Sequence, residues 1–180
     1  MIIVRLDSCP STNDEAKRLA RGGAAAGTAV AAGEQTAGRG TRGRSWHSPP
    51  GLGLYLSIVL RPPLPDLAGL PLLAARAVRD ALEAETGVRA SVEPPNDLVW
   101  EGRKLGGLLC ESGFEGGRLL FAVVGLGLNV GQQPDDFPPE LAAAAVSLRM
   151  ASGRAVSPGS LIVPLRDRIL ASIEASPASA

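Results

Sequence analysis

Residues 33–46 read Gly-Glu-Gln-Thr-Ala-Gly-Arg-Gly-Thr-Arg-Gly-Arg-Ser-Trp, and no other stretch constrains the fold and the chemistry as strongly. Three arginines alternate with three glycines before Trp46 closes the run. Glycine leaves backbone N–H groups open to a ligand, and the guanidinium group of arginine offers a rigid fork of donors to an anion. The stretch therefore predicts a loop that wraps a phosphate or a carboxylate, and the plain alternative is a solvated surface loop.

A second informative segment lies further along the chain, where Pro95-Asn96-Asp97 precedes a short hairpin at residues 99–104. The hairpin runs into residues 105–111, which read Leu-Gly-Gly-Leu-Leu-Cys-Glu. Lys104 is one of two lysines in the chain, and every other basic residue is an arginine. A lysine kept against such a bias indicates a need for a compact point charge, unless it survives by chance on an exposed turn.

Length and composition set the frame. A chain of 180 residues is long enough for one domain with a proper core. The formal net charge of zero predicts no broad basic surface for nucleic acid. Cys9 and Cys110 match neither a metal spacing nor a disulfide framework, which favours a reduced, cytoplasmic setting. We expect no signal peptide, because charges follow at once on the first apolar residues, and no apolar run approaches the roughly 18 residues that span a bilayer.

Short apolar runs bounded by glycine, proline and polar residues predict strands. Apolar residues at helical spacing predict a main helix at 67–86 and a last helix at 161–173, with a proline/aspartate loop at 132–140. A first helix is expected from Ser11 to the glycines at 22 and 23, with Ser11 and Thr12 each placed to open a capping box. The predicted strands are 2–6, 28–33, 54–60, 89–93, 98–100, 104–112 and 118–129.

Strands outnumber helices in this pattern and are joined by hairpins, which predicts an α+β fold with a mostly antiparallel or mixed β-sheet flanked by helices. The longest strand, 118–129, should be central. We expect a single catalytic domain over residues 1–175 and a frayed tail at 176–180.

Three familiar sites can be set aside. The glycines at 38, 40 and 43 match the spacing of a dinucleotide-binding loop, but that motif must open a helix, and the residues at 44–50 cannot start one. His47 is the only histidine, so a Ser-His-Asp triad would have to use a residue of a mobile loop. One histidine and two distant cysteines also argue against a zinc site.

Four blocks in this order, taken together, resemble the biotin–protein ligases. The first opens the first helix and the last closes the longest strand, so the resemblance runs from near the N-terminus to residue 130. The blocks are Ser11-Thr12-Asn13; residues 35–46; Pro95-Asn96-Asp97 with Arg103-Lys104-Leu105-Gly106-Gly107; and residues 125–130, which read Gly-Leu-Gly-Leu-Asn-Val.

The resemblance implies the catalytic domain of a class II biotin/lipoate ligase and a reaction in two steps. Biotin and ATP, with Mg²⁺, would give biotinyl-5'-adenylate and pyrophosphate. A lysine of a biotin carboxyl carrier protein, such as the acetyl-CoA carboxylase subunit, would then receive the biotin. The implied type is monofunctional, without an N-terminal DNA-binding domain, so we expect no DNA partner and no membrane partner. The sequence leaves monomer and homodimer both open.

The resemblance also implies roles for individual residues. Lys104 and Arg39 would be catalytic, and Asp97 would hold Mg²⁺. The biotin site would contain Ser11, Thr12, Asn13, Gln35, Arg39, Gly40, Thr41 and Lys104. The nucleotide site would contain Arg42, Arg44, Trp46, Asn96, Asp97 and Asn129. Simpler readings stay open, because Ser11 and Thr12 could be helix caps, Trp46 a loop anchor, and Asn96 and Asp97 turn formers.

The chain departs from the family pattern in three places. Thr41 stands where arginine is usual, and Glu93 and Pro94 stand where lysine and tryptophan usually precede Pro-Asn-Asp. The small β-barrel domain that usually follows the last helix is expected to be absent from this chain. Two alternatives remain open: a lipoate ligase or octanoyl transferase of the same fold, and a biotin-binding module with weak or no catalysis. The Arg-Arg-Ser-Gly-Gly-Gly-type loop of the lipoyl enzymes is absent from the sequence.

Overall fold

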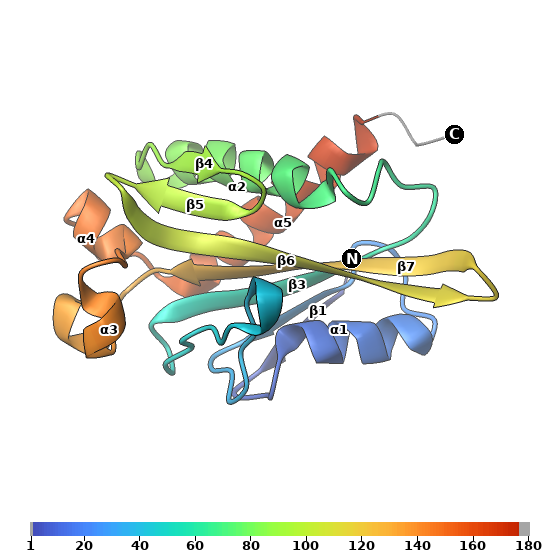
Figure 1. Cartoon of the computed structure of the whole chain (residues 1–180), viewed down its shortest axis with the longest axis horizontal. Coiled ribbons are helices and arrows are strands. Elements are labelled where there is room, and N and C mark those ends of the chain that lie inside the picture. The colour runs from blue at the N-terminus through green and yellow to red at the C-terminus, as the bar shows by residue number, and fades with distance from the viewer. Residues whose placement is uncertain (1, 177–180) are drawn as a thin grey trace.

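A computed structural model describes residues 2–176 and shows five α-helices and seven strands in that range. Figure 1 shows them packed around one sheet. No helix among these residues has the length and apolar character needed to cross a membrane. The helices are α1 (Thr12–Arg21), α2 (Leu70–Thr86), α3 (Pro139–Ala142), α4 (Leu148–Ser152) and α5 (Pro158–Glu174). The strands are β1 (Ile3–Leu6), β2 (Ala29–Ala32), β3 (Gly53–Leu60), β4 (Ser91–Glu93), β5 (Asp97–Trp100), β6 (Arg103–Glu115) and β7 (Arg118–Asn129).

The seven strands form one mixed sheet in the order β1-β2-β3-β7-β6-β5-β4. Only β1 and β2 run parallel, and every other neighbouring pair is antiparallel. This confirms the predicted α+β fold with a mostly antiparallel sheet, and β7 lies at its centre as predicted.

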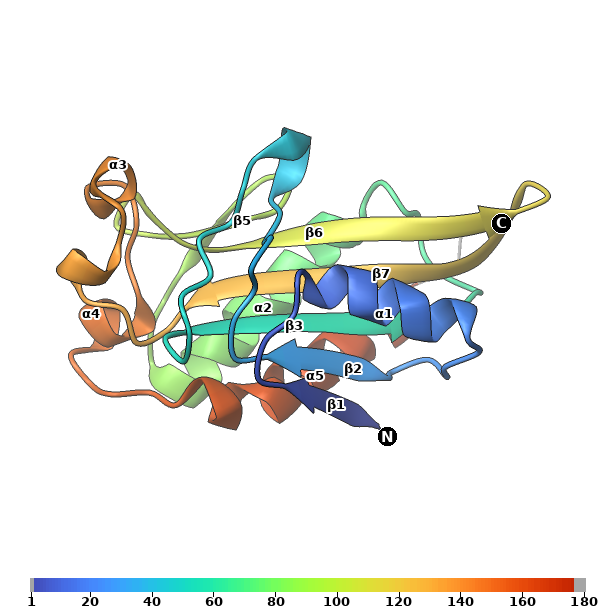
Figure 2. The ribbon, with the colours of Figure 1, turned by 90° about the horizontal axis from the view of Figure 1, so that it is seen from below.

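The helices cover the sheet unequally. Helices α2 and α5 lie on one face, whereas α1 lies on the other, on the same side as the loop that follows β2 (Figures 1 and 2). The larger core fills the space under α2 and α5, and a smaller cluster, which includes Ala16, Val59 and Phe121, packs under α1. Because side chains alternate along a strand, every second residue of β3 and β7 belongs to the larger core.

The same alternation determines which β7 residues lie on the opposite face of the sheet, the face that α1 covers. On β7, Phe121 and Val123 pack under α1, and the next residues on that face are Gly125, Gly127 and Asn129. The apolar half of β7 therefore packs against α1. The glycine half has no side chains on this face, so it leaves space above the sheet near the start of α1.

The structure differs from the sequence expectation mainly in boundaries. Helix α2 begins at Leu70 rather than residue 67, and α5 begins at Pro158 rather than residue 161. The segment expected as a plain loop at 132–140 contains a 3-10 turn at Pro134–Asp136 and the start of α3, and α4 was not predicted. Residues 177–180 of the predicted frayed tail lie outside the described residues.

The predicted capping boxes at α1 are wrong. Ser11 is the N-cap by position, but its side chain makes no capping hydrogen bond. Ser11, Thr12 and Asn13 are all buried, and their side chains are turned toward the cavity described below.

Candidate active site

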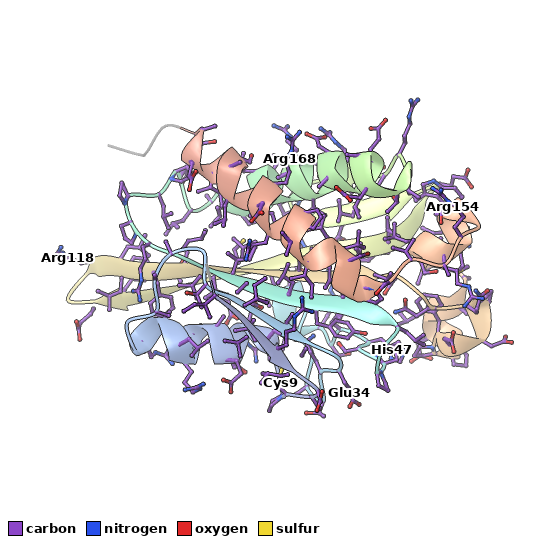
Figure 3. All side chains as sticks on the ribbon, turned by 180° about the vertical axis from the view of Figure 1, so that it is seen from behind. Cys9, Glu34, His47, Arg118, Arg154 and Arg168 are labelled. Atoms are coloured by element: carbon purple, nitrogen blue, oxygen red, sulfur yellow. The ribbon has the colours of Figure 1, made fainter. Side chains whose placement is uncertain are left out.

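A cavity of about 220 Å³ lies on the α1 face of the sheet, between the start of α1, the arginine/glycine loop and the strands β5, β6 and β7. Its lining extends to the end of the sheet where α3 lies, because Leu141 of α3 belongs to it, and His47, another lining residue, marks that end in Figure 3. Arg118, at the tip of the β6–β7 hairpin, lies at the opposite end of the molecule. The predicted site residues that line the cavity are Ser11, Thr12, Asn13, Gln35, Arg39, Gly40, Thr41, Arg44, Trp46, Asn96, Asp97, Lys104 and Asn129.

One predicted site residue, Arg42, lies elsewhere: it is exposed with a φ of 58° and does not line the cavity. Glu93, one of the departures from the family pattern, is exposed on β4 and is also absent from the lining.

The floor of the cavity depends on glycines of β7. A Cβ atom on Gly127 would lie 2.6 Å from the Trp46 indole, and one on Gly125 would collide with the Asn13 amide. Both contacts are too close for a Cβ atom, so any larger residue at Gly127 or Gly125 would displace Trp46 or Asn13. This explains why the block at residues 125–130 alternates glycine with leucine.

Hydroxyl and amide groups gather at one end of the cavity. The Gln35 Oε1 atom accepts hydrogen bonds from the Thr12 backbone N–H at 2.9 Å and lies 3.1 Å from the Thr12 hydroxyl. Behind them, the fully buried Ser57 hydroxyl lies 2.8 Å from Thr12 Oγ1 and 2.6 Å from Asn13 Oδ1. The Gln35 Nε2 atom donates to Ser48 at 3.1 Å. This end can therefore offer several donors and acceptors to an uncharged polar ligand.

A cluster of charges ties the loop to α1 and β6. Arg39 donates to both carboxylate oxygens of Asp14, at 2.6 and 2.7 Å, and to Glu111 at 3.2 Å. Lys17 lies 3.0 Å from Asp14 and 2.7 Å from Glu111. The Arg39 hydrogen bond lowers the pKa of Asp14 to about 2, against the effect of burial, and Lys17 adds to it. Burial by itself would raise the pKa of Glu111, but hydrogen bonds from Lys17 and Asn13 and the charges of Lys17 and Arg39 lower it overall.

Lys104 lies at the other end of the cavity. Its Nζ atom is 2.9 Å from Asp97 Oδ1 and 5.6 Å from the centre of the Trp46 ring. Asn96 also donates to Asp97 Oδ1, at 3.1 Å, and to the Leu108 carbonyl at 3.0 Å. A cation, a carboxylate and an aromatic face are thus held together within the lining.

A β-bulge directs Lys104 into the cavity. Leu98 of β5 pairs with Gly106 of β6, but the next residue, Val99, pairs with Lys104, so Leu105 is an extra residue in β6. Leu105 is buried in the larger core, whereas a Cβ on Gly107 would lie 3.5 Å from the Lys104 side chain. The extra residue therefore brings Lys104 onto the same face as Gly107, which strict alternation would not do.

The backbone of Lys104 is fixed from outside the sheet as well. Its N–H donates to the Ala144 carbonyl at 2.7 Å, and its carbonyl accepts from the Val146 N–H at 3.0 Å. The Asn129 amide donates to the carbonyls of Lys104, at 3.3 Å, and Val146, at 3.1 Å. Asn129 thus joins the end of β7 to the segment that supports Lys104.

Trp46 holds an unusual position. Its indole Nε1 is buried against Gly127 and has no hydrogen-bond partner among residues 2–176. A buried donor without a partner costs about 1–3 kcal/mol. The ring therefore rests on Gly127 at some cost in free energy, with the Lys104 ammonium group facing it.

Sequence reasoning missed several residues of the site. Glu111 and Ser57 carry no motif of their own, although Glu111 lies near the end of the strand predicted at 104–112. Phe137, Leu141, Ala144 and Ala145 also line the cavity. Phe137 comes from the loop predicted at 132–140, and the other three follow that loop, where we predicted no element. Their apolar character gave no signal, because it is equally typical of core.

The residues that could hold a metal are few. No group of three or more His, Cys, Asp or Glu side chains in the described part of the chain is placed to hold an ion. Asp97 is the one carboxylate that lines the cavity, and both of its contacts, from Lys104 and Asn96, fall on Oδ1.

Comparison with known proteins gives consistent results. Residues 6–129 match the family described as Biotin/lipoate A/B protein ligase family. The chain is 42% identical over 162 residues to the bifunctional ligase/repressor BirA of Bacillus spizizenii, covering 89% of this chain and 50% of that protein. It is 41% identical over 154 residues to the biotin–[acetyl-CoA-carboxylase] ligase of Paracoccus denitrificans, covering 82% of this chain and 63% of that protein. The chain thus spans about half of the first relative's length.

Solved structures agree with the sequence matches. The biotin protein ligase from Aquifex aeolicus in complex with biotin and ATP superposes with a TM-score of 0.83 at 32% identity, covering 96% of this chain and 70% of that one. The ligase from Leishmania major in complex with biotinyl-5-AMP gives a TM-score of 0.71 at 26% identity, covering 95% and 71%. The fold and the order of its elements are therefore those of solved ligases.

Proposed function

The chain belongs to the biotin/lipoate A/B protein ligase family, and we propose that it activates biotin with ATP and transfers the biotinyl group to a lysine of a biotin carboxyl carrier protein. Relatives that carry the name biotin–[acetyl-CoA-carboxylase] ligase support the substrate and the reaction class. The names of two further neighbours record biotin with ATP and biotinyl-5-AMP as bound ligands.

One observation carries the proposal. A single cavity joins a neutral hydrogen-bonding end, at Thr12 and Gln35, to a cationic end at Lys104. Biotin has an uncharged ureido ring at one end and a carboxylate at the other. The cavity can therefore orient the ring at one end and hold the carboxylate where a phosphate can meet it.

In the first step, the biotin carboxylate oxygen attacks the α-phosphorus of ATP, the bond to the β,γ-pyrophosphate breaks, and pyrophosphate leaves. Both reactants are anions, so fixed cations at the junction lower the barrier. Lys104 exchanges Asp97 for the reacting oxygens, and Arg39 supplies a second cation from the loop. Trp46, Asn96 and Asn129 lie on the nucleotide side of the proposed site.

In the second step, the ε-amino group of the carrier lysine attacks the acyl carbon of biotinyl-adenylate. An amide bond forms, AMP leaves, and the amine loses a proton. The adenylate is a mixed anhydride that water would hydrolyse, so it must be shielded between the two steps. The loop at residues 38–50 lies over the cavity and can provide this shield.

Mg²⁺ fits this site as an ion carried by the nucleotide. Mg²⁺ is commonly held by one or two carboxylates together with substrate phosphates and water. Asp97 would be its protein ligand, and the ion would supply charge neutralisation on the phosphates.

Biotin-dependent ATP–pyrophosphate exchange tests the proposal. Biotin should stimulate the exchange, and octanoate and lipoate should not. Equal stimulation by octanoate, or stimulation by octanoate alone, would assign the chain to the lipoyl branch of the family. Biotin binding without exchange would instead indicate a binding module.

Two expectations about partners stay predictions. Several relatives are named ligase/repressor, and the chain spans about half of their length, so the proposal concerns the ligase reaction alone. The absence of a DNA partner and the oligomeric state are to be measured on the intact protein.

A further inference from the structure

We propose that Glu111 is a positioning residue that sets the direction of a hydrogen-bond chain beneath the cavity, so that Thr12 offers its hydroxyl oxygen to the ligand as an acceptor. Glu111 belongs to β6 and does not itself line the cavity. The inference rests on the proposed function, which places the biotin ureido ring at the end of the cavity that holds Thr12; an N–H of that ring would be the donor to the Thr12 hydroxyl.

The hydrogen-bond chain starts at the Asn13 amide. Its Nδ2 atom donates to Glu111 Oε2 at 2.8 Å and to the Leu109 carbonyl at 3.2 Å. A carboxylate and a carbonyl can only accept, so the amide nitrogen must face them and the amide oxygen must face the other way. Glu111 stays ionised because Lys17 and Arg39 both contact it.

The next link is Ser57. Its hydroxyl has one proton and two close neighbours, Asn13 Oδ1 at 2.6 Å and Thr12 Oγ1 at 2.8 Å. Because the amide oxygen can only accept, the Ser57 proton goes to Asn13. The short contact between Ser57 and Thr12 is then a hydrogen bond only if Thr12 donates to Ser57.

This order of donors and acceptors fixes where the Thr12 hydroxyl proton points. The single proton points down to Ser57 and away from the cavity, so the hydroxyl can only accept from a ligand. Gln35 Oε1 is still satisfied, because it accepts from the Thr12 backbone N–H. If Asn13 were turned over, the order would reverse: Ser57 would donate to Thr12, and the Thr12 proton would be left to Gln35 Oε1, 3.1 Å away. One of the two Thr12 lone pairs would then no longer be free for a ligand N–H.

The charge cluster suggests a simpler role for Glu111, as a plain ion-pair partner of the loop. Asp14 allows the two roles to be separated. It contacts the same two cations, Arg39 and Lys17, but has no hydrogen bond to Asn13. Asp14→Asn therefore weakens the ion pairs and leaves the amide direction intact.

A residue swap tests the inference. Asn13→Asp places two carboxylates in contact, whereas Asn13→Asp with Glu111→Gln restores a donor facing an acceptor and still lets position 13 accept from Ser57. We expect the biotin Kd, measured by isothermal titration calorimetry, to rise on the order of 10- to 100-fold in Asn13→Asp. The double variant should recover about tenfold of that loss. Asp14→Asn loosens the anchor of Arg39 but leaves the Asn13 amide in place, so it should raise the Kd by about threefold, clearly less than Asn13→Asp.

Further readouts separate positioning from structure. The KM for biotin should rise in Asn13→Asp while kcat at saturating biotin is retained, and the loss should not follow the melting temperature. If Asn13→Asp fails to fold, Glu111→Gln alone should raise the biotin Kd by about three- to tenfold. Lys17 and Asn13 contact different oxygens of Glu111, and Gln has only one oxygen. A double variant that binds no better than Asn13→Asp, or a Glu111→Gln protein that binds like wild type, overturns the inference. A wild-type protein without biotin binding would overturn the proposed function instead.

Discussion

The setting of Lys104 illustrates how single residues define this site. Its ammonium group is balanced by Asp97 at 2.9 Å and faces the Trp46 ring, and its side chain is about one-third exposed. An entering phosphate therefore meets a cation that is already oriented. Only one other lysine exists in the chain, Lys17, and it lies in the charge cluster outside the cavity lining.

Lys104→Ala should remove most adenylation while the fold is retained. Loss of one preorganised donor to a developing charge typically costs on the order of 100- to 1,000-fold in rate. Single-turnover formation of biotinyl-adenylate measures the effect, with circular dichroism to verify the fold and Lys17→Ala as the matched control. A loss smaller than about tenfold would show that Lys104 is not at the reaction centre.

The two charge departures from the family pattern should behave differently. Thr41 lines the cavity beside Arg44, whose guanidinium donates to its hydroxyl at 3.2 Å, so Thr41→Arg adds a cation where the adenylate would lie. Glu93 is exposed on β4, so Glu93→Lys should be nearly neutral. We expect Thr41→Arg to slow release of the adenylate, measured by chase with excess biotin. Equal off-rates in Thr41→Arg and wild type would mean that Thr41 is neutral drift.

At the scale of elements, the sequence predicted what depends on local pattern. The strands around β7 and the main helix follow from alternation and helical spacing, whereas the residues that line the cavity were predicted from the family resemblance. The sequence could not predict features set by contacts between distant segments. The bulge at Leu105 requires knowing how β5 and β6 pair, and the role of Glu111 requires knowing that β6 passes beside α1. Ser11 misled us because a helix cap and a cavity-lining hydroxyl have the same local sequence.

The loop at residues 38–50 gives a prediction at this scale. All three arginines are exposed, but Arg39 is held by Asp14 and Glu111, whereas Arg42 and Arg44 have no ion-pair partner among residues 2–176. Trypsin should therefore cut first after Arg42 or Arg44 in the free protein, and biotin with ATP should slow these cuts. Mass spectrometry of a time course identifies the sites, and biotin without ATP is the control. Cleavage at equal rates with and without both ligands would contradict a loop that closes over the adenylate.

At the scale of the whole molecule, the charge cluster connects three segments that are far apart in the sequence. Asp14 on α1, Arg39 in the loop and Glu111 on β6 meet at one point and hold the cavity's rim together. Since the loop and α1 share this anchor, weakening it should affect both the stability of the fold and the order of the loop.

The cluster should make stability depend on acid. The pKa of Asp14 is about 2, below its ordinary 3.8, because Arg39 hydrogen-bonds to it. A carboxyl with a lowered pKa stabilises the fold above its ordinary pKa, and this stabilisation disappears as the pH falls from about 4 to about 2. Urea unfolding of wild type and Asp14→Asn should therefore differ at pH 5 and converge at pH 2. A gap that stays constant over this range would show that Asp14 contributes nothing through its charge.

The extra residue in β6 lets Lys104 and Gly107 share one side of a strand although they are three residues apart. A regular strand offers only two sides, and residues an odd number of positions apart emerge on opposite ones. Replacing Leu105 by another apolar residue should change only packing. Deleting it would remove the bulge but leave Lys104 two residues before Gly107, so the ammonium group would still emerge on the cavity side. The deletion variant should therefore retain far more adenylation than Lys104→Ala, and a loss as large as that of Lys104→Ala would show that the bulge itself places the lysine.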